Sequence, residues 1–213
     1  MNITPAIEIY KAAKESIQRS QFCAELTWQA TRDTNQFTEP ELLRECAWVI
    51  LCAGFKESVI RRRFLFISTC FCNWESCDSI CDCAQLCRVT ALSCFRNERK
   101  IQAILDAAAY VRKTGFEHYK KQILDDPLPA LSNLPFIGKI TANHLAKNLG
   151  FDLAKADRHL QKFALSMGFG HPQELCVRIS DATGDPVRVV DLILWRYLEQ
   201  RQTRERSSPI TDC

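Results

Sequence analysis

The sequence has few of the features that mark a β-protein, a membrane protein or a secreted protein. Only seven of its 213 residues are glycine, and neither an Asn-Gly nor an Asp-Gly pair indicates a hairpin of strands. Its longest apolar runs, 47–55 and 187–197, are too short or too charged to span a bilayer. The start of the chain lacks the basic-then-apolar pattern of a secretory signal. We therefore expect a cytoplasmic protein that does not contact membranes.

The charges are nearly balanced. The chain has 28 Lys and Arg against 25 Asp and Glu, a formal net charge of +3. No overall field therefore favours nucleic acid, and any such role must come from local basic clustering. A hydrophobic content of 46% and a charged content of 25% are typical of a globular chain, here long enough for two small lobes.

Helix start signals, in contrast, are abundant. Thr38 with Glu41 forms a capping box before an apolar run that ends at Gly54. Asp185-Pro186 places a cap and a first-turn proline before another such run. The sequence therefore predicts an all-α fold of about ten helices joined by short loops.

Cysteine is concentrated in one segment. Seven of the twelve cysteines lie between residues 70 and 94. Cys77/Cys81 and Cys83/Cys87 are spaced four apart, as zinc ligands on a helix can be. However, no C-x-x-C occurs, and the two pairs fall on different faces of what the sequence predicts as one helix. We do not expect zinc, because reduced cysteine packs as a small hydrophobe, and the sequence leaves open whether the cluster from Cys70 to Cys94 has a role.

The most specific signal is LPFIGKITA at 134–142, followed by KADRHLQKF at 155–163. This pair resembles the hairpin and catalytic-aspartate loop of the helix-hairpin-helix (HhH-GPD, endonuclease III-like) DNA glycosylase superfamily. The resemblance implies a two-lobed helical fold that acts as one glycosylase unit, with DNA in the cleft between the lobes. One lobe would span residues 37–150 and the other would combine 1–36 with 151–213. The matching positions are Leu134, Pro135, Ile137, Gly138, Thr141, Ala142 and Asp157.

The hairpin itself suits a phosphate. Gly138 is expected to let the chain turn tightly, and the helix that follows begins with unpaired N–H groups and a positive dipole end. The resemblance implies a monovalent cation, Na⁺ or K⁺, on the backbone carbonyls of Ser132, Leu134 and Ile137. Phe136 is a departure, because the family usually has glycine there. The residues expected to contact DNA from the hairpin are Phe136, Gly138, Lys139, Ile140 and Thr141.

Asp157 is the predicted catalytic residue. Cleaving the bond between base and sugar builds positive charge on the sugar, which a fixed carboxylate stabilises while it orients water. The target nucleotide must first flip out of the stack. Asp157 also stands where it could simply cap a helix that starts at Arg158. The resemblance favours catalysis.

Position 140 bears on whether the strand is also cut. Strand-cutting members of the family have a lysine there as Schiff-base nucleophile, and Ile140 cannot attack anything. The sequence therefore predicts a monofunctional glycosylase that leaves an abasic site. The alternatives are a lyase that uses Lys139 or another nearby lysine, and a non-catalytic DNA-binding protein. We expect no iron–sulfur cluster, because the C-terminal region has only Cys176 and Cys213.

Residues near the predicted DNA come from a loose alignment with the family. Phe55 would wedge into the gap left by the flipped base, or would be a core aromatic, with Lys56 on the DNA beside it. Trp28, in what reads as an irregular polar stretch, would line the base pocket with Gly54 and Glu57. The expected partner is double-stranded DNA with a damaged or modified base, bound by a monomer that is nucleoid-associated if bacterial. The sequence leaves open which base is excised, and whether the role is repair or defence against foreign DNA.

Overall fold

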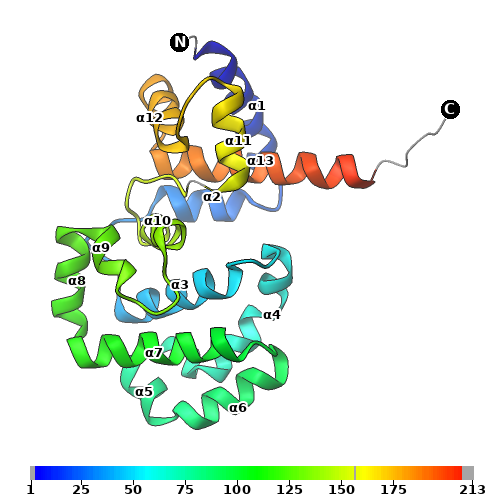
Figure 1. The fold of residues 1–213 in the computed structure, drawn as a ribbon. Helices are drawn as coiled ribbons and strands as arrows, with labels where there is room; N and C mark the ends of the chain where they lie inside the picture. Colours follow the sequence, from blue (N-terminus) through cyan, green and yellow to red (C-terminus); the bar gives the residue numbers. More distant parts are fainter. Residues whose placement is uncertain (1–2, 156, 208–213) are drawn as a thin grey trace. The chain divides into compact units, whose positions relative to one another are not determined.

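The computed structural model describes residues 3–155 and 157–207, with only the backbone for 202–207. Within these residues the chain forms thirteen α-helices, one short 3-10 helix and no strand, so the all-α prediction is confirmed. The chain divides into two compact units (Figure 1), one of residues 1–32 with 150–213 and the other of residues 33–149. The predicted division, after residues 36 and 150, differs from this by a few residues.

The unit of residues 33–149 carries the hairpin. Its central helix α7 packs against α3, α5 and α6 (Figure 1). The predicted capping box opens α3: the Thr38 side chain accepts from the Glu41 N–H, and Glu41 accepts from the Thr38 N–H at 2.9 Å. The elements are α3 (Glu39–Cys52), α4 (Glu57–Cys70), η1 (Cys72–Trp74), α5 (Cys77–Asp82), α6 (Ala84–Cys94), α7 (Glu98–Thr114), α8 (Phe116–Asp125), α9 (Pro127–Ser132) and α10 (Lys139–Asn148).

The unit of residues 1–32 and 150–213 is built around its last helix. α13 packs against each of the other four helices of this unit. Arg188, at the start of α13, donates to the carbonyls of Gln29, Ala30 and Arg32 and so caps the end of α2. Asp185 accepts from the Tyr10 hydroxyl at 2.8 Å and pairs with Lys14 at 2.7 Å. The helices are α1 (Thr4–Gln18), α2 (Cys23–Ala30), α11 (Arg158–Ser166), α12 (Pro172–Thr183) and α13 (Val187–Ser207).

Candidate nucleic-acid interface and active site

The predicted hairpin forms between α9 and α10. Leu134 and Ile137 are 2% and 5% exposed, and the Ile137 N–H donates to the Leu134 carbonyl at 3.2 Å. These two buried side chains fix the turn in its unit. Phe136 and Ile140 are instead 42% and 54% exposed, and the Gly138 and Lys139 between them are exposed as well. The hairpin therefore presents its tip to solvent.

The tight turn is not made by Gly138, as the sequence suggested, but by Phe136. Gly138 has an extended backbone with φ −97°, which any residue can adopt. Phe136 has φ +68°, a left-handed conformation that costs a residue with a Cβ roughly 1–2 kcal/mol. A Cβ at Gly138 would meet nothing within 4 Å in its own unit. Neither backbone geometry nor packing within the unit requires a glycine at 138, and the position leaves room for an outside group to approach the backbone.

The N-terminus of α10 lacks a side-chain cap, because its capping residue is Gly138. The Thr141 hydroxyl accepts from the Gly138 N–H at 2.7 Å, which braces the turn. The first-turn amides of Lys139 and Ile140 follow, and neither amide has a side-chain cap bond. These amides, the helix dipole and the exposed ammonium of Lys139 together suit an anion.

The sequence did not single out Lys100, which is buried and contacts the Phe136 ring of the hairpin. Its ammonium donates to the carbonyls of Ile50, Leu51 and Ala53 at 2.5, 2.7 and 2.6 Å and caps the end of α3. Burial lowers the pKa of Lys100 to about 8, because removal from water disfavours the charged amine. A signal did exist, since Lys100 continues the buried stripe of α7 formed by Ile104, Ala107 and Val111.

Asp157 lies in the other unit, at the N-cap of α11. Its Oδ1 accepts from the amides of His159 at 2.9 Å and Leu160 at 3.0 Å. The capping role that the sequence allowed is therefore present. Because both bonds use Oδ1, they fix the half-buried carboxylate and leave Oδ2 available to a ligand. Capping and catalysis are compatible in this geometry.

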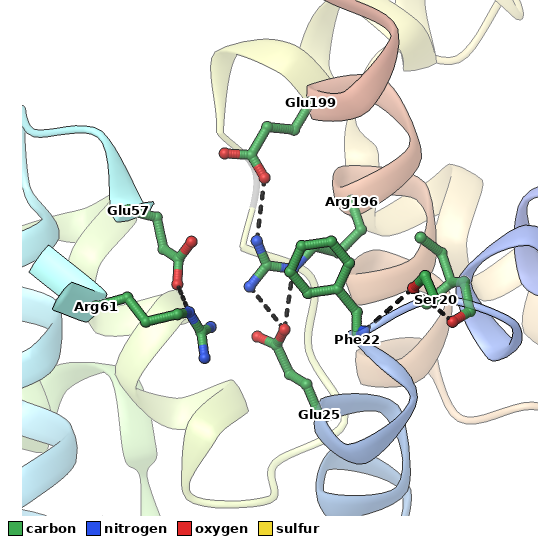
Figure 2. Close-up of polar contacts among 8 residues, drawn as sticks. Ser20, Phe22, Glu25, Glu57, Arg61, Arg196 and Glu199 are labelled. Atoms are coloured by element: carbon green, nitrogen blue, oxygen red, sulfur yellow. Dashed lines mark hydrogen bonds and ion pairs between the residues drawn. The ribbon is translucent and has the colours of Figure 1, made fainter. Parts of the chain in front are cut away.

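The remaining predicted residues are divided between the units. Phe55 is 43% exposed, so it is not a core aromatic, and Gly54 and Lys56 beside it are also exposed. Glu57 begins α4 and is held by the Arg61 guanidinium at 2.5 Å (Figure 2). Trp28 was predicted in an irregular stretch but lies half-buried on α2, with the Arg32 guanidinium 5.4 Å from its ring.

An Arg196 cluster is a second feature that the sequence did not reveal. Its guanidinium is 1% exposed and donates from Nε and Nη2 to the Glu25 carboxylate at 2.9 and 2.6 Å (Figure 2). Nη1 reaches Glu199 at 3.0 Å, and the Phe22 ring lies 4.2 Å from the guanidinium carbon. Because Glu25 and Phe22 lie at α2 while Arg196 and Glu199 lie on α13, the cluster holds α2 against α13.

The part of the cysteine-rich segment that holds Cys77, Cys81, Cys83 and Cys87 was predicted as one helix but forms α5 and α6, which meet at Cys83. Burial raises the pKa of Cys77 and Cys87 to about 12, which keeps both thiols protonated. Among the described residues, no three His, Cys, Asp or Glu side chains converge to hold a metal ion. Nor is any described helix both long and apolar enough to cross a membrane.

Comparison with solved structures finds DNA glycosylases of similar fold. The 8-oxoguanine DNA glycosylase of Thermotoga maritima superposes with a TM-score of 0.62 at 18% identity, over 91% of this chain and 96% of that one. The 8-oxoguanine glycosylase/lyase of Methanocaldococcus jannaschii, bound to a 15mer DNA containing 8-oxoguanine, gives 0.56 at 16% identity, over 91% and 98%. No protein-family profile and no curated protein sequence matches the chain. The helix-hairpin-helix glycosylase fold expected from the sequence is confirmed.

Proposed function

We propose that this protein is a monofunctional DNA N-glycosylase that leaves an abasic site. The observation that carries the proposal is the Asp157 carboxylate, fixed through Oδ1 at the start of α11 within a fold shared with two DNA glycosylases. The hairpin would hold a DNA phosphate. The target nucleotide would leave the stack before the reaction, because its glycosidic bond is unreachable within a duplex.

Asp157 would act on the extruded nucleotide through Oδ2. Departure of the base leaves positive charge on the sugar, and a fixed carboxylate stabilises that charge without having to reorganise. The same oxygen orients the water that attacks the sugar carbon. The amides of His159 and Leu160 hold Oδ1 throughout, so the carboxylate keeps its direction.

The absence of an amine at position 140 supports the monofunctional assignment. Ile140 is 54% exposed at the place where strand-cutting members carry their lysine. Lys139 is one residue away, which on a helix turns its side chain by about 100°. We therefore assign Lys139 to phosphate contact. The Methanocaldococcus relative is a glycosylase/lyase, which keeps the alternative of a lyase with another lysine open to test.

The substrate is proposed as an oxidised purine, because 8-oxoguanine is the base named for both structural relatives. The experiment is base release, measured by mass spectrometry, from duplexes that carry 8-oxoguanine, uracil, alkylated purines or naturally modified bases. The DNA strand is examined by gel before and after alkali. A free base, with breaks only after alkali, supports a monofunctional glycosylase and identifies its substrate. Tight DNA binding without release from any duplex would favour a non-catalytic DNA-binding protein.

Borohydride trapping tests the lyase alternative. Wild type should form no covalent adduct with the DNA, because a Schiff base requires an amine at the sugar. Ile140→Lys, which restores the family's amine, provides the matched positive control. A wild-type adduct that disappears in Lys139→Gln would show that Lys139 is the nucleophile and that the protein is bifunctional.

We also propose that the carbonyls of Ser132, Leu134 and Ile137 hold a monovalent cation when DNA binds. Neutral carbonyl oxygens are hard ligands that suit such an ion, and the buried side chains of Leu134 and Ile137 fix two of them. The ion would add positive charge where a phosphate approaches. Replacing K⁺ by tetramethylammonium at constant ionic strength should weaken DNA binding. Equal affinity in both salts would exclude the site.

A further inference from the structure

Two exposed aromatic rings lie against one buried ammonium in the unit of residues 33–149. The Lys100 ammonium is 4.8 Å from the centre of the Phe55 ring and 5.4 Å from that of Phe136. Both distances lie within the range of a cation–π contact. Phe55 also packs on Phe95, with ring centres 5.3 Å apart. The loop after α3 and the hairpin before α10, far apart in sequence, thus present their rings together.

The buried side chain of Lys100 fixes the position of the two rings. Lys100 is 3% exposed, and three carbonyls at the end of α3 hold its ammonium. These three hydrogen bonds keep the ammonium in one place, so its contacts with the two rings have a fixed position as well. The rings are nevertheless 43% and 42% exposed, so this packing does not bury them.

Phe136 adopts a left-handed backbone conformation, φ +68°, that a bulky residue rarely adopts. Glycine would adopt it without strain, and the exposed ring recovers little through burial. Strain that packing does not explain is characteristic of a functional site. The ring stands next to Gly138 and Lys139, where the proposed function places a phosphate, so a strand held there would bring its bases to the ring.

We propose that Phe55 and Phe136, joined through Lys100, form a stacking surface for DNA bases that lose their neighbour when the target nucleotide flips out. The proposal rests on the proposed function. It adds Phe136 and Lys100 to the wedge expected of Phe55 alone. Every base has a π-face, so the surface would favour DNA with a vacancy in the stack whatever the sequence.

The experiment compares binding to an intact duplex and to the same duplex with a tetrahydrofuran abasic analogue and an adjacent 2-aminopurine. Phe136→Leu keeps an apolar side chain without the ring, and Phe66→Leu on α4, where Phe66 is 54% exposed, is the matched control. We expect Phe136→Leu and Phe55→Leu each to weaken binding to the abasic duplex about tenfold and to reduce quenching of 2-aminopurine. Binding to the intact duplex should weaken by a clearly smaller factor, and Phe66→Leu should match wild type on both duplexes.

Lys100→Met tests the link between the rings, because it keeps the apolar stem and removes the ammonium. It should weaken abasic-duplex binding at least as much as either single Phe variant, in protein that melts cooperatively. If Phe136→Leu binds both duplexes as wild type does, the stacking surface is wrong and the proposed function stands. If it weakens both duplexes equally, the ring makes a general DNA contact and the inference is again wrong. If wild type binds neither duplex, the proposed function fails as well.

Discussion

The amino-terminal ends of α10 and α11 have capping residues of opposite chemistry. At α10 the capping residue is Gly138, which has no side chain to offer, and Phe136, Lys139 and Ile140 near it are exposed. At α11 the capping residue is Asp157, whose Oδ1 takes the amides of His159 and Leu160. One helix end keeps its positive field for an outside anion, and the other is closed by an anion of its own.

In the proposed function, this difference separates DNA binding from catalysis. A carboxylate at position 138 would repel the phosphate that the open end suits. A glycine at 157 would leave no group to meet positive charge on a sugar. The two ends therefore cannot exchange their residues without loss of both roles, and each can be disrupted by itself.

The largest expected effect comes from Asp157→Asn. Base release under single-turnover conditions should fall at least about 100-fold, because the amide carries no charge to stabilise the transition state. Asparagine caps a helix about as well as aspartate, so the free energy of unfolding should change by less than about 0.5 kcal/mol. Asp157→Ala should lose the same activity and a further ~1 kcal/mol of stability. Full activity in the asparagine variant would reduce Asp157 to a cap.

Gly138→Ala disrupts the open end. We expect DNA affinity to fall about tenfold, because a Cβ would stand between the backbone and a phosphate. Folding should be little affected, since φ is −97° and nothing lies within 4 Å of the added atom. Gly184→Ala is the reciprocal control: its φ of +76° makes alanine cost about 1 kcal/mol, with no expected change in affinity. Affinity is measured by titration and stability by denaturant unfolding.

Lys139→Gln refines the comparison by removing charge and leaving the backbone in place. Affinity should fall a few-fold for every DNA sequence, and the slope of log K against log salt should decrease by about 1. Lys11→Gln on α1 removes an exposed charge outside the interface and should leave the slope unchanged. An unaltered slope for Lys139→Gln would mean that no phosphate lies there.

The last prediction concerns Lys100, whose ammonium lies against the Phe136 ring in the turn before α10. Its folded pKa of about 8 lies below the ordinary lysine value of 10.5. Between these values the unfolded chain keeps a proton that the folded chain has released, so raising the pH stabilises the folded state. The difference in unfolding free energy between wild type and Lys100→Met should therefore shift in favour of wild type from pH 8 to 10.5. A constant difference would place the folded pKa near 10.5.

The sequence predicts best those features that depend on contacts between residues close together in the chain, such as helix caps. The Thr38–Glu41 box and the Asp157 cap form because a side chain three residues away can reach the amide that it satisfies. Lys100 and Arg196 were missed, because the carbonyls that hold Lys100 are 47–50 residues away in sequence and the Glu25 that holds Arg196 is 171 residues away. The left-handed turn at Phe136 was missed for another reason: glycine is the usual residue for such a φ, so the sequence directed attention to Gly138.

The most direct test of the account is single-turnover base release as a function of protein concentration, for wild type, Asp157→Asn and Gly138→Ala. The plateau rate reports chemistry, and the half-saturating concentration reports binding. We expect Asp157→Asn to lower the plateau and keep half-saturation, and Gly138→Ala to raise half-saturation and keep the plateau. If both variants change the same quantity, the separation of roles between the two helix ends is contradicted.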